Sequence, residues 1–180
     1  SLLAGVEAAT LRGRFMRARS IVRLEPNLPV SIRRGVIGLY SDDADDALRT
    51  QISQLAAALG YAMWTSSEKT LEAVGSVSGP GPAYVARFIA ALAKAGVRSG
   101  LPEATALTIA VETTLGTAWM AAANREPMDA VVARVASPNG TTQAGLAVLD
   151  PHLDNLMAST IEAAARRGAE LAEEAADLSS

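Results

Sequence analysis

The sequence has little of what many enzyme sites are built from. It contains no cysteine, which excludes disulfide bonds, thiolate nucleophiles and zinc–thiolate centres. Its one histidine, His152, cannot form a histidine-based metal cluster by itself. Aromatic residues make up 4% of the chain, no basic stripe accompanies them, and the net charge is −3. The sequence therefore predicts no nucleic-acid partner.

Long apolar runs and signal segments are also missing. No uninterrupted apolar run reaches the roughly 18 residues of a membrane span, so we expect no membrane partner. Hydrophobic residues nevertheless make up 49% of the chain, and the mean hydropathy of +0.20 predicts a folded protein. No basic and apolar signal segment opens the chain, which predicts a cytoplasmic protein. Because the sequence begins at Ser1 inside a helical pattern, we expect a further N-terminal portion.

Several common catalytic signatures do not occur. The sequence has no P-loop, no His-Glu-x-x-His and no Gly-x-Ser-x-Gly. Residues 79–82 (GPGP) do not predict a phosphate cradle, because two prolines remove N–H groups that a cradle needs. The aspartates within residues 42–46 lack the central glycine and terminal glutamate of a calcium loop. They predict a solvated turn at a helix N-terminus.

The first third of the chain alternates strand and helix patterns. Residues 1–15 and 45–59 read as helices, and short apolar runs read as strands at residues 20–24, 36–40 and 61–64. This order predicts the closing part of an α/β domain. Three strands make a small sheet for a domain, which again indicates an upstream portion.

From residue 66 onward the pattern is helical and rich in alanine. Helices are predicted over residues 83–99, 102–123 and 127–136, and a last helix is predicted to begin after Pro151. The first two are apolar over most of their surface, so each must be covered on more than one side. We infer a core shared between subunits. The alternative is that neighbouring elements of the same chain cover both helices.

Residues 137–142 (SPNGTT) lie between two predicted helices. Pro138 ends the preceding helix, the Asn-Gly pair after it favours a turn with positive φ, and Thr141 lies where an N-cap is expected. Free backbone N–H groups, the positive end of a helix dipole and three hydroxyls together predict a pocket for a small anion such as a carboxylate. An ordinary capped loop is the alternative. A site without a strong acid or base suits a charged small molecule whose chemistry a cofactor performs.

Three motifs, in the right order and at the right distances, resemble the pyrroline-5-carboxylate reductase family. They are residues 78–84 (SGPGPAY), 95–102 (AGVRSGLP) and 137–146 (SPNGTTQAGL). Residues 23–30 (RLEPNLPV) resemble the upstream loop of the same family, so the similarity extends over essentially the whole chain.

The resemblance implies a function and a fold. Family members reduce the cyclic imine Δ1-pyrroline-5-carboxylate to L-proline with NADPH or NADH, the last step of proline biosynthesis. The implied fold is α/β plus all-α: the C-terminal part of a Rossmann-type dinucleotide-binding domain at residues 1–65, then an all-helical dimerisation and substrate-binding domain at residues 66–180. The implied partners are a second copy in a homodimer, with a decamer as a further assembly, and a small imino-acid substrate.

The resemblance also implies the site residues. The substrate carboxylate lies at the loop, and the hydroxyl of Thr142, the catalytic candidate, faces the ring nitrogen. The loop near the nicotinamide carries the two cofactor-binding candidates, Asn27 and Pro29. The Gly-rich turn for the cofactor pyrophosphate is absent from this chain. The substrate-binding candidates are Ser137, Asn139, Gly140, Thr141 and Thr142.

Four residues depart from the family pattern. Glu25 stands in place of Met, Leu28 in place of Thr, Pro80 in place of Ser, and Asn139 in place of Gly. Leu28 and Asn139 are implied to lie near the reacting centre, which leaves a reductase of another cyclic imino acid as an alternative. The missing nucleotide turn leaves a catalytically silent dimerisation module as another.

Overall fold

A computed structural model of the chain describes residues 1–3 and 5–177. The chain divides into two compact units. Unit 1 consists of Ser1–Pro82 and Ser159–Ser180, and unit 2 is Ala83–Ala158. Residues 178–180 of the predicted helical domain lie outside the described residues. None of the described helices is long and apolar enough to cross a membrane.

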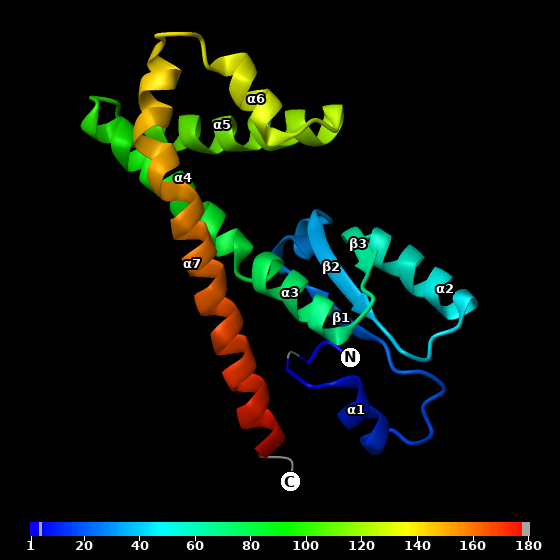
Figure 1. The fold of residues 1–180 in the computed structure, drawn as a ribbon. Coiled ribbons are helices and arrows are strands. Elements are labelled where there is room, and N and C mark those ends of the chain that lie inside the picture. The colour runs from blue at the N-terminus through cyan, green and yellow to red at the C-terminus, as the bar shows by residue number, and fades with distance from the viewer. Residues whose placement is uncertain (4, 178–180) are drawn as a thin grey trace. The chain divides into compact units, whose positions relative to one another are not determined.

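Unit 1 contains a three-stranded sheet in the order β1-β2-β3 (Figure 1). Strand β1 (Arg23–Pro26) runs antiparallel to β2 (Gly35–Tyr40), and β2 runs parallel to β3 (Gly60–Trp64). All three predicted strands are confirmed, with β1 beginning and ending slightly later than expected. In the register, Glu25 lies opposite Gly38.

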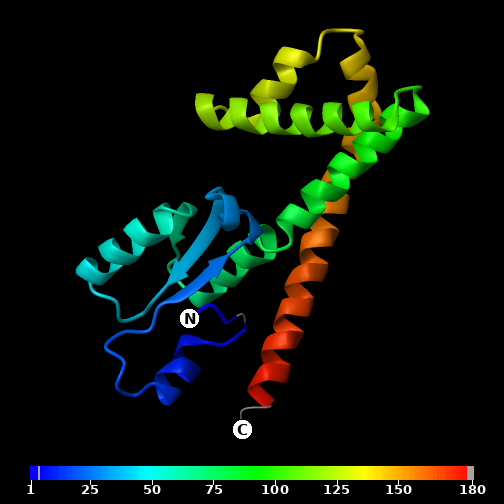
Figure 2. The same ribbon diagram turned by 180° about the vertical axis from the view of Figure 1, so that it is seen from behind.

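Helices α2 (Asp46–Ala57) and α3 (Glu68–Ser78) cover opposite faces of this sheet, as the two views in Figures 1 and 2 allow the reader to follow. Alternate residues of a strand point to opposite faces. Leu39 of β2 therefore packs with the α2 side in one buried cluster, whereas Gly38 faces α3. A side chain at Gly38 would meet a methyl carbon of Leu71 at 2.7 Å. The centre of unit 1 is thus well covered.

Short polar caps begin both of these helices. Asp45 accepts a hydrogen bond from the backbone N–H of Leu48 at 2.8 Å, and Ser67 accepts one from Thr70 at 3.1 Å. The first cap confirms the prediction of a solvated turn and helix N-terminus for the aspartate cluster.

The predicted helix over residues 1–15 is wrong at residues 1–3 and 5–7, because α1 spans only Ala8–Arg14, and at residue 4 the prediction lies outside the described residues. Ser1 instead runs beside β1: its nitrogen donates to the Val22 carbonyl at 2.6 Å, and the Leu24 N–H donates to the Ser1 carbonyl at 2.8 Å. That pattern is the hydrogen bonding of a parallel strand. Gly5, with a φ of 72°, then turns the chain away from helical geometry.

The remaining helices follow the predicted order. Helices α4 (Gly81–Arg98), α5 (Glu103–Asn124) and α6 (Met128–Val135) confirm the three predicted segments within a few residues. Gly100 takes a φ of 98° between α4 and α5, a conformation that glycine adopts without steric cost. The α/β part is therefore followed by helices alone, in agreement with the predicted fold class.

The prediction that a new helix begins after Pro151 is wrong. Helix α7 (Thr141–Asp177) runs through this proline without a break. A proline inside a helix removes one hydrogen bond and crowds the carbonyl four residues earlier, at a cost of about 3 kcal/mol. This 37-residue helix continues on both sides of Pro151, so one missing bond does not end it.

Unit 2 buries only small side chains. Its buried hydrophobic residues are Ala93, Ala106, Ala110, Ala121 and Val131. Large apolar side chains of α5 are instead exposed, with 57% of Leu115 and 58% of Trp119 accessible. The prediction that α4 and α5 are not covered by their own chain is consistent with this pattern.

Candidate functional site

The loop between α6 and α7 is a tight turn. The Gly140 N–H donates to the Ser137 carbonyl at 3.0 Å, and Asn139 has a φ of 57°. Asparagine tolerates this left-handed conformation better than most residues, because its short polar side chain can bond locally. The predicted positive-φ turn is confirmed at Asn139.

Helix α7 starts one residue earlier in its capping pattern than predicted. The Ala144 N–H donates to the Gly140 carbonyl at 3.2 Å, which makes Gly140 the N-cap and Thr141 the first helical residue. The expectation that Thr141 is the N-cap is therefore wrong. The physical reason is that a different side chain accepts a hydrogen bond from the backbone of the turn.

That side chain is Gln143, which the sequence reasoning missed. Its Oε1 accepts a hydrogen bond from the backbone N–H of Asn139 at 2.7 Å. A glutamine three residues after the N-cap commonly reaches back to the N–H of the N-cap, so the spacing from Gly140 to Gln143 was a signal in the sequence, although here the side chain reaches one residue further, to Asn139. The bond holds the turn closed against the start of the helix.

Gly140 is needed for steric reasons as well. A side chain at this position would collide with the hydroxyl oxygen of Ser137, and its Cβ would lie 3.0 Å from the Ser137 carbonyl oxygen. The missing side chain lets the turn fold back closely enough to bring Ser137 beside the first turn of α7.

The turn gathers hydroxyls and amides at one helix end. Ser137 and Thr141 are exposed, and Thr142 is half-buried. The first N–H groups of a helix have no partner within the helix, and the dipole there favours negative charge. Together with the hydroxyls of these three residues, the first-turn amides offer neutral donors to an anion the size of a carboxylate.

Asn27 and Pro29 lie in unit 1, whereas the loop lies in unit 2. They belong to the turn between β1 and β2, which contains the short helix η1 (Leu28–Ile32). Pro29 sits in the first turn of η1, and its carbonyl accepts from the Arg34 N–H at 3.0 Å.

The side chain of Asn27 contacts backbone on two sides. Its Oδ1 accepts from the Val36 N–H at 2.8 Å, and its Nδ2 donates to the Ser78 carbonyl at 3.0 Å. The Asn27 N–H also donates to the Val36 carbonyl at 3.2 Å. Sequence reasoning gave no indication that this amide holds structural bonds.

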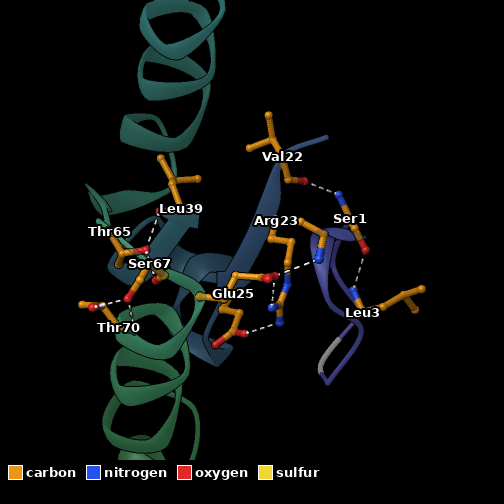
Figure 3. Close-up of polar contacts among 11 residues, drawn as sticks. Ser1, Leu3, Val22, Arg23, Glu25, Leu39, Thr65, Ser67 and Thr70 are labelled. Carbon is orange, nitrogen blue, oxygen red and sulfur yellow. Dashed lines mark hydrogen bonds and ion pairs between the residues drawn. The ribbon is translucent and has the colours of Figure 1, made fainter. Parts of the chain in front are cut away.

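A buried ion cluster lies next to this turn, and sequence reasoning also missed it. Arg23 is 2% exposed, and its guanidinium donates to Glu68 at 2.6 Å and to Glu25 at 3.2 Å; Figure 3 shows Arg23 reaching to Glu25. Burial raises the pKa of Glu25, Arg23 lowers it, and the nearby Glu72 raises it, with a net upward shift.

Within the described residues, no group of three or more His, Asp or Glu side chains is arranged to hold a metal ion. Close to Pro29 in the sequence, Leu28 is 75% and Ile32 72% exposed, and the polar side chains of Ser31, Arg33 and Arg34 are exposed as well.

Comparison with known proteins gives one consistent result. A family model described as pyrroline-5-carboxylate reductase dimerisation matches residues 68–171. The chain is 37% identical over 176 residues to pyrroline-5-carboxylate reductase of Pseudomonas aeruginosa, covering 97% of the chain and 64% of the relative. It is 35% identical to the protein of the same name from Synechocystis, covering 95% and 64%. The chain thus spans less than two thirds of the length of these relatives.

Solved structures agree. The pyrroline-5-carboxylate reductase of Coxiella burnetii has a TM-score of 0.91 and 34% identity, covering 95% of this chain and 64% of that one. A Plasmodium falciparum pyrroline carboxylate reductase with NADP bound has a TM-score of 0.84 at 24% identity, covering 96% and 70%. The second match supports the fold alone.

Proposed function

Since this chain belongs to the pyrroline-5-carboxylate reductase dimerisation family, we propose that it works in the reduction of Δ1-pyrroline-5-carboxylate to L-proline. Its fold is part of a Rossmann-type domain followed by an all-helical dimerisation domain. The observation that carries the proposal is the turn at residues 137–142, where hydroxyls and first-turn amides meet at the start of α7. The substrate would be an imino acid whose one anionic group is a carboxylate.

The loop binds and orients this substrate. First-turn amides and the hydroxyls of Ser137 and Thr141 hold the carboxylate, and the backbone of Asn139 and Gly140 shapes the turn around it. The half-buried Thr142 hydroxyl faces the ring nitrogen and fixes its hydrogen-bonding direction. We assign Thr142 the catalytic role, because it contacts the atom whose bonding changes.

The reaction adds a hydride to the imine carbon, the π electron pair of the C=N bond moves to the nitrogen, and the nitrogen binds a proton from water. NADPH or NADH supplies the hydride when bound. Asn27 and Pro29 mark the segment at the nicotinamide, as the resemblance of residues 23–30 to the family implies. The protein needs no strong base for this chemistry, since its main task is to align the two reactants.

We propose a homodimer formed through unit 2, and a decamer as a further assembly. Support comes from the exposed apolar side chains of α5, including Leu115 and Trp119, and from a family model whose description names dimerisation. A second copy of the chain is the partner that covers this surface. We also propose a boundary between two domains at residues 65 and 66, which the start of the family match at residue 68 supports.

The test is the oxidation of NADPH and of NADH by the full-length protein with Δ1-pyrroline-5-carboxylate. We expect turnover that stops when the imine is omitted. The same assay, paired with cell fractionation, checks the predicted cytoplasmic location by asking which fraction carries the activity.

Two other outcomes identify the alternatives. Turnover of a six-membered cyclic imine but not of the five-membered one would favour a reductase of another imino acid, which the exposed Leu28 and Asn139 leave open. No cofactor binding by the full-length protein would favour a silent dimerisation module.

A further inference from the structure

Alternate residues along β1 and just beyond it form a polar row. Arg23, Glu25 and Asn27 are two residues apart, so they point to the same face of the strand. Leu24 between them packs on the opposite face, in the cluster that faces α2. The polar row therefore faces α3, and it contacts that helix at both ends.

At the N-terminal end of α3, Arg23 bonds the first residue of the helix. The Arg23 guanidinium lies 2.6 Å from Glu68, and the same carboxylate oxygen accepts the Ala8 N–H at 2.8 Å. The Arg23–Glu68 pair is costly to break, because removing either partner leaves an uncompensated charge. It fixes where α3 begins.

At the middle of α3, Glu25 lies directly against Gly75. A side chain at Gly75 would collide with the Glu25 carboxylate. Glycine is a poor residue inside a helix, and here its missing side chain provides the space for Glu25. The strand and the helix therefore approach closely at this level.

At the C-terminal end of α3, Asn27 bonds the last residue of the helix. The last carbonyls of a helix have no partner within it, and the Asn27 Nδ2 donates to the carbonyl of Ser78 at 3.0 Å. The other end of the same amide accepts from Val36 of β2 at 2.8 Å. The planar amide of Asn27 thus connects the end of α3, the start of β2 and the segment that carries Pro29.

We propose that Asn27 is a positioning residue for the reductase. Its side chain holds the Pro29 segment and the end of α3 in fixed register, and the cofactor is contacted by Pro29 and the backbone of that segment rather than by the Asn27 amide. The inference rests on the proposed function and refines its cofactor assignment. It also explains the amide at this position, because a carboxylate of the same shape lacks the donor that Ser78 needs.

Two variants of the full-length protein separate the two bonds. Asn27→Asp keeps the acceptor for Val36 and removes the donor for Ser78, whereas Asn27→Ala removes both. Hydrogen exchange measured by mass spectrometry on peptides that cover residues 74–80 and 35–40 reads each contact without any need for activity. Asn124→Asp is the matched control, because the amide of Asn124 is exposed and donates to the nearby Glu126, away from both peptides in the sequence.

We expect exchange at the end of α3 to accelerate at least about fivefold in both variants, as the loss of one hydrogen bond implies. Exchange at Val36 should accelerate in Asn27→Ala alone. The control should change neither peptide. In the activity assay, kcat should fall about tenfold in Asn27→Asp, while the KM for NADPH stays within about threefold.

Two results would overturn the inference. One is unchanged exchange in both peptides for both variants. The other is a KM for NADPH that rises more than about tenfold with kcat and exchange unchanged, since that outcome makes the amide a direct cofactor ligand. If the full-length wild-type protein shows no reductase activity, the proposed function fails, and the exchange data still decide the positioning role.

Discussion

Units 1 and 2 use their apolar residues in different ways. Unit 1 has a core of large side chains, with Leu39 and Leu71 fully buried between the sheet and its helices, while others such as Leu55 stay exposed. In unit 2 the buried positions are mostly alanines, and large side chains such as Leu115 and Trp119 are more than half exposed. Unit 1 thus has a core of large apolar side chains, whereas unit 2 has a core of small ones and carries large apolar side chains at its surface. The exposed side chains of unit 2 support the proposed homodimer.

The largest expected effect is on association. Replacing Leu115 with glutamate places a charge on the exposed surface of α5, and burying it against a second copy is strongly unfavourable. We expect the dimer dissociation constant to rise at least about a thousandfold, measured by analytical ultracentrifugation. The control is Leu55→Glu in α2, because Leu55 is 64% exposed but lies in unit 1. An unchanged dimer in Leu115→Glu contradicts the interface.

The next effect tests the core of unit 1. Leu39→Ala should destabilise the protein by about 2–5 kcal/mol, because it removes a fully buried side chain and leaves a cavity. Urea unfolding should give this loss at every protein concentration. Leu55→Ala serves as the exposed counterpart and should change stability by less than about 0.5 kcal/mol. Equal losses in the two variants would contradict a core of large side chains around Leu39 in unit 1.

A smaller effect is expected at the loop. Thr142→Ala should lower kcat/KM for the imine by about ten- to a hundredfold, since one oriented hydrogen bond to substrate is lost. Stability should hardly change, because Thr142 is only half-buried. Thr142→Ser keeps the hydroxyl and should recover most of the rate. Equal rates in the alanine and wild-type proteins would exclude Thr142 from the site.

The smallest effect concerns the charge inside unit 1. Burial raises the pKa of Glu25 above its ordinary value, so the folded state binds this proton more tightly than the unfolded state. The resulting stabilisation of the folded state is fully present at pH values below the ordinary pKa of glutamate. It is lost as the pH rises through the pKa that Glu25 has in the folded protein. Glu25→Gln cannot ionise, so its stability relative to wild type should improve from about pH 4 to pH 7, by less than about 1 kcal/mol.

Urea unfolding at both pH values measures this change. A wild-type advantage that grows with pH would mean that the pair with Arg23 outweighs burial.

The sequence predicted elements well where local chemistry decides them. The turn at Asn139 follows from the conformational freedom of asparagine and glycine, and it is present. The prediction at Pro151 was wrong because a proline removes only one hydrogen bond of a helix. Helix α7 is long and continues on both sides of that position. The N-cap was misassigned because the choice depended on the reach of Gln143.

Long-range contacts were beyond the sequence. Nothing local indicates that Arg23 meets Glu68, 45 residues later, or that the amide of Asn27 reaches Ser78. Both contacts depend on how α3 lies across the sheet, which many distant residues decide together. The motif at Asn27 indicated an important position, and only the structure indicates what its side chain bonds.

The turn before α7 also has a consequence for how its binding preference can change. Gly140 must be small, Asn139 must accept a left-handed backbone, and Gln143 must hold the turn closed. Ser137 contributes a hydroxyl, and so do Thr141 and Thr142, without such duties in the backbone. A directed-evolution library that fixes positions 139, 140 and 143 and randomises 137, 141 and 142 should therefore yield folded variants with new ligand preferences, since shape and recognition reside in separate residues.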